Sequence, residues 1–215
     1  MHIPDGFISP KFYLPAFAAA ATLWTVGARA ARRRLDAETI PQLAVITALA
    51  FILMMIALPL PGGTSVHASG IALLAVVFGV WTAYLSISLV LLLQALLFGM
   101  GGITSLPVNA LAMGMAGGLA AAAAFHALRP LHEKIALFAA GWISVVVPAL
   151  LLAIALGVQP LIAHTADGTP LFFPFTLEVT LPAVLIPHTL LGIGEGVLTV
   201  MEYYFLNRVR TGAET

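Results

Sequence analysis

The sequence has 215 residues, of which 61% are hydrophobic and only 8% charged, and its mean hydropathy is +1.06. Soluble domains carry about 25% charged residues, and the stretch from Thr39 to Leu128 has no Asp, Glu, Lys or Arg at all. A soluble fold is therefore excluded, and the balance of nine basic against nine acidic residues argues against nucleic acid as a partner. Because the chain has no cysteine, any metal must be held by nitrogen or oxygen donors.

Proline, glycine and charged residues divide the chain into seven apolar segments, which predict an all-α polytopic membrane protein with about seven transmembrane helices. The third segment is short for a full span and carries Gly70 and Gly79, so it is either tilted or buried among its neighbours. In chain order the predicted helices cover residues 12–30, 41–60, 66–80, 82–99, 105–128, 133–157 and 180–206.

No domain boundary interrupts these segments, so we expect one transmembrane domain over residues 1–210 and a short cytoplasmic tail over residues 211–215. The amino terminus lacks the pattern of a cleaved signal peptide, and Met1 is therefore expected to remain on the mature protein.

The basic residues predict the orientation in the membrane. With seven spans, eight of the nine fall on one side, which the positive-inside rule assigns to the cytoplasm; they are Arg29, Arg32, Arg33, Arg34, Arg129, Lys134, Arg208 and Arg210. Only Lys11 falls on the opposite side. We therefore expect the amino terminus outside and the carboxyl terminus in the cytoplasm.

This topology brings Met1 and His2 to the same outer face as His67, in the loop between the second and third segments. A free amino terminus followed by histidine is a chelator, because the α-amine, the His2 amide nitrogen and His2 Nδ1 close two rings around one metal. An in-plane amide donor favours tetragonal Ni(II) or Cu(II), and an imidazole from His67 would complete four nitrogens. The alternative is that both histidines are simply solvated, with His67 at the surface of its loop.

Four polar residues inside the predicted helices have two interpretations each. Gln94 and Asn109 either hydrogen-bond the amino-terminal loop or a ligand histidine, or they make ordinary contacts between helices. His188 and Glu195, seven residues apart on one helix face, form either a proton relay or second metal station, or a buried polar network capped by Glu195. The residues favour the second interpretation of this pair.

Several short motifs run along the chain: Met1-His2-Ile3-Pro4-Asp5-Gly6-Phe7, Pro61-Gly62-Gly63-Thr64 with His67, Gln94-Ala95-Leu96-Leu97-Phe98-Gly99, Gly101-Gly102-Ile103, Asn109 and Gly194-Glu195-Gly196. Over residues 1 to about 205 the chain resembles the CbiM/NikM family, the substrate-binding S components of energy-coupling-factor (ECF) transporters for nickel and cobalt. The resemblance implies that Met1, His2 and His67 bind Ni(II) or Co(II) as a transported substrate. It also favours a loop-supporting role for Gln94 and Asn109.

The resemblance also implies partners in the inner, cytoplasmic membrane: a transmembrane coupling (T) subunit and two ATP-binding-cassette ATPase subunits. The family's frequent carboxyl-terminal extension is missing from this sequence, so a small CbiN/NikN-like membrane subunit is expected as a separate chain. In S components an alanine-rich face of the first helix docks the coupling subunit, which would be Ala16 and Ala20 here. No phosphate-binding loop is present, so this chain is not expected to be an enzyme.

Two other functions are compatible with a polytopic membrane protein. The first is a stand-alone proton-coupled metal transporter that uses His188 and Glu195. The second is an intramembrane metalloenzyme, although the sequence has no helical His-Glu-x-x-His element. The sequence does not distinguish nickel from cobalt, nor uptake for a nickel enzyme from uptake for cobalamin synthesis.

Overall fold

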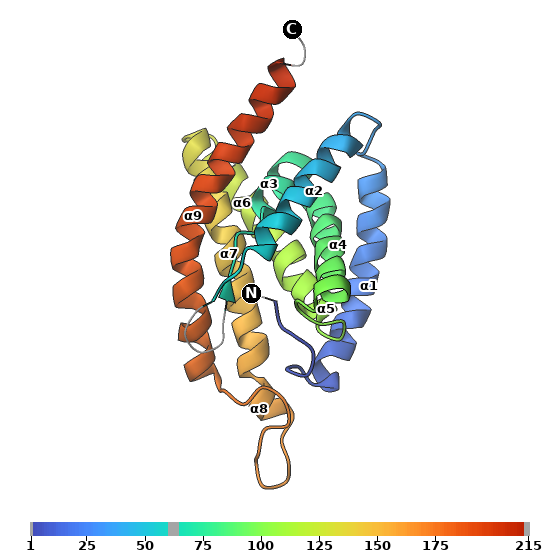
Figure 1. Cartoon of the computed structure of the whole chain (residues 1–215), viewed down its shortest axis with the longest axis vertical. Coiled ribbons are helices and arrows are strands. Elements are labelled where there is room, and N and C mark those ends of the chain that lie inside the picture. The colour runs from blue at the N-terminus through green and yellow to red at the C-terminus, as the bar shows by residue number, and fades with distance from the viewer. Residues whose placement is uncertain (1, 60–64, 213–215) are drawn as a thin grey trace.

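The chain folds into an elongated bundle of helices that run roughly along one axis (Figure 1). The structure, a computed structural model, describes residues 2–59 and 65–212. Its elements are α1 (Pro10–Arg32), α2 (Thr39–Met55), β1 (Leu58–Pro59), β2 (Ser65–Val66), α3 (Ile71–Phe78), α4 (Val80–Phe98), α5 (Leu106–Asn109), the π-helix η1 (Ala110–Gly117), α6 (Gly118–Leu128), α7 (Glu133–Gly157), α8 (Gln159–Ile162) and α9 (Leu177–Gly212).

Four helical stretches of the described chain are long and apolar enough to cross a membrane, and α2 is a shorter apolar helix. The four are Val80–Phe98, Leu106–Leu128, Glu133–Ile162 and Leu177–Arg210. The predicted all-α membrane architecture is therefore confirmed at this level, and the predicted segments 82–99, 105–128 and 133–157 agree with the observed helices within two residues. The count of seven spans stays a prediction.

The third predicted segment is the one that differs most from a spanning helix. Residues 65–70 are not helical, and α3 has only eight residues, so it is about 12 Å long at 1.5 Å per residue. That is less than half of the roughly 30 Å hydrocarbon core of a bilayer. Six of its residues are buried, and α3 packs against α4, α6, α7 and α9. It is therefore a core helix. It is short because Gly70 and Gly79, both at positive φ, set its two ends.

The segment from Leu106 to Leu128 is continuous but changes its helical pitch. It begins as α5 with a proline in its first turn, continues as the π-helix η1 and ends as α6. A π-helical stretch is rare and is often found at functional sites. Asn109 lies at the start of this stretch and is buried.

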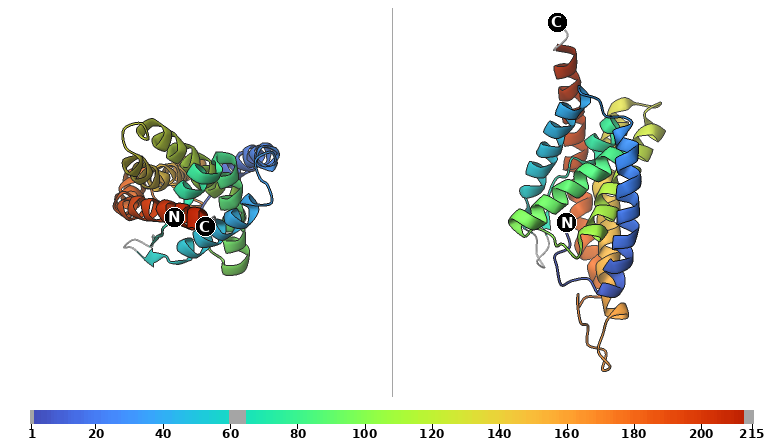
Figure 2. Two further views of the ribbon diagram at one scale, coloured as in Figure 1. Left: turned by 90° about the horizontal axis from the view of Figure 1, so that it is seen from above. Right: turned by 90° about the vertical axis from the view of Figure 1, so that its right-hand side faces the viewer.

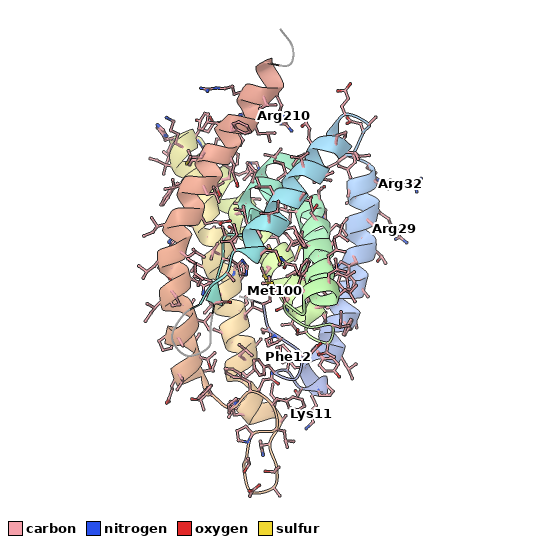
Figure 3. All side chains as sticks on the ribbon, in the orientation of Figure 1. Lys11, Phe12, Arg29, Arg32, Met100 and Arg210 are labelled. Carbon is pink, nitrogen blue, oxygen red and sulfur yellow. The ribbon has the colours of Figure 1, made fainter. Side chains whose placement is uncertain are left out.

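The two ends of the bundle differ in charge. Arg29, Arg32 and Arg210 lie toward the end at which α9 finishes, whereas Lys11 lies toward the other end (Figure 3). At the first end Arg210 donates hydrogen bonds to Gln42 at the start of α2, and Lys134 lies over the ring of Tyr204. The helices thus gather the basic residues at one end, as their assignment to one side of the membrane requires.

Helix α9 packs closely along α7. Figure 2 shows the bundle from above on the left and from the side on the right. The close approach depends on glycine, because a Cβ at Gly196 would lie 2.8 Å from the carbonyl oxygen of Phe138 on α7. A Cβ at Gly141 would lie 2.7 Å from the carbonyl oxygen of Glu195. Small residues let two membrane helices approach backbone to backbone, and here this approach fixes the position of Glu195.

A methyl group at this contact should therefore destabilise the bundle. We expect Gly196→Ala to lower the free energy of unfolding by about 1–3 kcal/mol, the usual cost of overpacking, in thermal unfolding of the detergent-solubilised protein. Gly194→Ala is the matched control on the same helix, because a Cβ there meets no atom within 4 Å. Equal melting temperatures for the two variants would show that α7 and α9 do not pack as described.

Candidate metal site at the amino terminus

The start of the amino-terminal segment runs into the bundle (Figure 1), whereas Asp5, Gly6 and Phe7 are exposed. Residues 2–9 are not helical, and Ile3 is only 1% exposed. The Ile3 amide donates to Asn109 Oδ1 over 3.0 Å, and the Ile3 carbonyl accepts from Asn109 Nδ2 over 3.0 Å and from Ser105 Oγ over 2.5 Å. The side chains of Ser105 and Asn109 therefore supply the hydrogen bonds of the Ile3 amide and carbonyl, which lie in no helix or sheet.

The next part of this segment, at Asp5, is hydrogen-bonded to the turn that follows α4. The amides of Ile103 and Thr104 donate to the Asp5 carboxylate over 3.1 and 2.8 Å. Burial acts to raise the pKa of Asp5, but the hydrogen bonds from Thr104 and Ile103 outweigh it and hold the pKa below its usual value. A side chain at Gly101 would crowd His2, because its Cβ would lie 3.2 Å from His2 Cβ, and Gly101 also has φ +78°.

The second non-helical segment carries His67. It follows the short antiparallel pair β1–β2 and ends at α3. The carboxylate of Glu195 on α9 accepts from three donors of this segment: the Ser69 amide, the Ser69 hydroxyl at 2.7 Å and the Gly70 amide at 2.8 Å. Glu195 thus anchors the segment immediately after His67 to α9.

These two segments bring His2 and His67 together. Their ring centroids are 4.7 Å apart, with 41° between the ring planes. Nδ1 of His67 lies 3.0 Å from the Ala68 carbonyl, and because a carbonyl only accepts, Nδ1 carries the proton and Nε2 has a free lone pair. Nε2 of His67 and Nε2 of His2 are both buried without a hydrogen-bond partner in the described structure.

Both imidazoles are kept neutral. Burial lowers the pKa of His2 well below its ordinary value, and the neighbouring His67 lowers it further. Burial likewise lowers the pKa of His67 to about 3. A neutral imidazole is the form that binds a metal, so neither ring has to lose a proton at neutral pH. His67 is 2% exposed, which corrects the expectation that it lies at a loop surface.

One donor of the expected chelate, the α-amine of Met1, lies outside the described residues. Met1 and residues 60–64, including the Pro61-Gly62-Gly63-Thr64 motif, lie outside the described residues. Within residues 2–59 and 65–212 no group of three or more His, Asp or Glu side chains is arranged to hold a metal. A metal at His2 and His67 would therefore need further donors of another kind, such as backbone or amino-terminal nitrogens.

Of the other expected residues, Asn109 contacts the amino-terminal segment, as described above, whereas Gln94 contacts α2. Gln94 is fully buried and its Nε2 lies 3.4 Å from the Phe51 carbonyl. His188 is also buried, with Nδ1 bound to the Val184 carbonyl over 2.7 Å. The carboxylate of Glu195 binds the backbone of residues 69–70, and no hydrogen bond joins it to His188 among those that the structure describes.

The alanine face expected to dock a partner points inward. Ala20 is 0% exposed, its carbonyl accepts from the Tyr84 hydroxyl of α4, and Ala16 packs against the hydrophobic core. The alanines of α1 that are exposed include Ala18 and Ala19. Ala20 is thus covered by α4, and docking of a partner at Ala16 and Ala20 stays a prediction.

Three residues that build the candidate site have no role predicted from the sequence alone. Asp5 and Ser105 hold the amino-terminal segment, and Ser69 links the His67 segment to Glu195. Asp5 lies within the Met1–Phe7 motif, which was the one available signal. Nothing local distinguishes Ser69 or Ser105 from other small polar residues, because their partners are about a hundred residues away.

Comparison with known proteins gives a consistent assignment. The family model of CbiM, described as a cobalt uptake substrate-specific transmembrane region, matches residues 2–213. The fused nickel transport protein NikMN of Rhodobacter capsulatus is 40% identical, covering 97% of this chain and 62% of its own length. The probable fused nickel transport protein LarMN of Lactiplantibacillus plantarum is 41% identical, covering 97% of this chain and 65% of its own length. The chain thus spans less than two thirds of the length of these two relatives.

Other relatives match over nearly their whole length. A putative metal transport protein of Haloquadratum walsbyi is 33% identical, covering 98% of this chain and 91% of that protein. Two crystal structures, described as a transition metal transporter and a truncated form of one, superpose with TM-scores of 0.92 at 39% and 38% identity. They cover 97% of this chain, and 93% and 99% of their own chains. The chain belongs to the CbiM family.

Proposed function

We propose that this chain is the substrate-binding membrane component of an importer for Ni(II) or Co(II). The observation that carries the proposal is the meeting of two buried, neutral imidazoles, His2 and His67, in which Nε2 of His67 has no hydrogen-bond partner among the described residues. Relatives named as nickel and cobalt transport proteins support the choice of metal. The chain itself catalyses no reaction.

In the proposed site the metal has four nitrogen donors. They are the α-amine of Met1, the amide nitrogen and Nδ1 of His2, and Nε2 of His67. An amide nitrogen in the coordination plane suits the tetragonal geometry of Ni(II), and therefore nickel fits slightly better than cobalt. The Asn109 and Glu195 contacts would hold the two segments in place without touching the metal, as supporting residues of metal sites usually do.

The proposed setting is the cytoplasmic membrane, with the amino terminus outside and the basic end of the bundle in the cytoplasm. Positive charges gathered at one end of the helices support this orientation. Proposed partners are a transmembrane coupling subunit, two ATPase subunits and a small CbiN/NikN-like subunit. The names of the fused relatives, LarMN and NikMN, support the last of these.

The proposal favours a binding component over a proton-coupled transporter. A relay through Glu195 would need a carboxylate free to change partners, whereas this one accepts from the Ser69 and Gly70 donors. These bonds support the role of an anchor for the His67 segment.

The loss of His67 should abolish tight metal binding. We expect His67→Gln, which keeps a polar side chain of similar size, to weaken Ni(II) binding at least about a hundredfold, about 2.8 kcal/mol, in calorimetric titration of the purified protein. His164→Ala, which removes an exposed histidine from the 163–170 loop, should bind like the parent. If His67→Gln matches the parent, His67 is not a ligand.

The amino terminus should be equally indispensable. One extra residue before Met1 would turn the amine into a peptide nitrogen and shift the chelate rings by one position. We therefore expect an amino-terminal tag to abolish Ni(II) binding, while a tag after Thr215 leaves it intact. Equal affinities of the two tagged proteins in the same titration would rule out the chelate.

The orientation can be tested because the chain has no cysteine. We expect a cysteine at Ala166, which is exposed in the loop before α9, to react with a membrane-impermeant maleimide added to intact cells. A cysteine appended after Thr215 should react only after the membrane is permeabilised. The reverse labelling pattern would contradict the proposed topology.

A further inference from the structure

An apolar groove opens on the outside of the bundle between α7 and α9. Its volume is about 320 Å³, and five of its six lining residues are apolar. The lining residues are Lys134, Ile135 and Phe138 of α7 and Val197, Val200 and Met201 of α9. Because Ile135, Val197 and Met201 are exposed, the groove is open to the surroundings of the helices, which in a membrane are lipid.

The groove begins where the close contact between the two helices ends. Gly141 and Gly196 bring α7 and α9 together backbone to backbone, and the groove follows them toward the basic end, starting at Phe138 and Val197. From Val197 to Tyr204 the helix advances about 10 Å. That is about two thirds of the hydrocarbon depth of one leaflet, which is half of the roughly 30 Å core.

A cation stands at the basic end of the groove. Nζ of Lys134 lies 5.6 Å from the centroid of the Tyr204 ring, and the Tyr204 hydroxyl donates to Glu133 Oε2 over 2.9 Å. Tyr204 therefore holds the acidic side chain by its hydroxyl and the ammonium by the face of its ring. Within the described residues no ion pair with a carboxylate is found for Lys134. One turn further along α9, Arg208 is exposed on the face that carries Tyr204.

A second groove shows which feature is distinctive. It lies between α2 and α4, has a volume of about 580 Å³, and is lined by apolar residues together with Thr47 and Ser86. No charged residue is among its lining. Of these two grooves, the one between α7 and α9 alone joins an apolar channel to a positive charge.

This combination matches the chemistry of an anionic phospholipid. The phosphate of such a lipid needs a cation at the level of the membrane interface, and its acyl chain needs an apolar surface that starts at the same level. Tyrosine is enriched at that level, and basic pockets between membrane helices bind anionic headgroups. A helix of a partner protein would fill the apolar channel but would leave the charge of Lys134 without an anion.

We propose that the groove between α7 and α9 binds one anionic phospholipid. Its phosphate lies at Lys134 and Arg208, and one acyl chain runs along Val197 and Met201 toward the glycine contact. The proposal goes beyond the proposed function, because it requires a chain that crosses a membrane and requires neither a bound metal nor a partner subunit.

The test counts lipids on the purified, detergent-solubilised chain. The protein is titrated with anionic dioleoylphosphatidylglycerol and, in parallel, with zwitterionic dioleoylphosphatidylcholine, and native mass spectrometry gives the dissociation constant of the first bound lipid. We expect the parent to bind the anionic lipid at least about fivefold more tightly than the zwitterionic one. Lys134→Gln should weaken binding of the anionic lipid about fivefold, and Lys134→Gln combined with Arg208→Gln about 30-fold, from about 1 kcal/mol per charge.

Matched variants separate the headgroup site from general effects of charge and folding. Lys134→Arg keeps the charge and should bind the anionic lipid like the parent. Arg29→Gln removes an exposed cation from the same end of the bundle but outside the groove, and should also bind like the parent. Met201→Trp fills the groove without changing the charge and should weaken binding at least about fivefold, whereas Leu93→Trp, in the groove between α2 and α4, should not.

Several results would overturn the proposal. Equal affinity of the parent for the two lipids, or parent affinity in the double variant, would remove the headgroup site. Parent affinity in Met201→Trp would show that the lipid does not lie in the groove. If Met201→Trp keeps the lipid but no longer assembles with the partner subunits, the groove accepts a protein helix instead. None of these results bears on Ni(II) binding, which the titration of His67→Gln tests separately.

Discussion

The need to satisfy backbone hydrogen bonds in an apolar interior shapes this molecule. Helices satisfy their own amides and carbonyls, whereas non-helical backbone inside a membrane protein must find other partners. Two such segments, residues 2–9 and 65–70, enter the bundle. Asn109 and Ser105 pair with Ile3, and Glu195 pairs with residues 69–70. The site exists because these side chains bind main chain inside the bundle.

The same constraint accounts for the chemistry of the site. Burial that requires fixed backbone partners also keeps His2 and His67 neutral, and neutral imidazole is the form that binds a metal. Rigid anchors would place the proposed donors before a metal arrives, so less ordering would be needed on binding. A site assembled in this way would hold its ion tightly.

The sequence predicts what depends on local pattern. Apolar length and breaker residues locate α4, the Leu106–Leu128 segment and α7 within two residues. The motif beginning at Met1 predicts a role for His2, and the ring of His2 lies beside that of His67. Contacts between distant segments are beyond such patterns. Glu195 and Ser69 are 126 residues apart, and no periodicity pairs them. Likewise the inward face of Ala16 and Ala20 depends on where α4 packs, and the burial of His67 depends on the anchor at α9.

The most direct test of this account changes an anchor and leaves every ligand in place. Asn109→Ala removes the partner of the Ile3 amide, whereas Ser144→Ala, the control, removes a buried hydroxyl that bonds only within α7 among its described contacts. The measurement is the Ni(II) affinity of both purified variants by calorimetry. The account predicts about a 10–100-fold loss of affinity for Asn109→Ala, the usual effect of removing a supporting residue, and no loss for Ser144→Ala. Parent affinity in Asn109→Ala would contradict it.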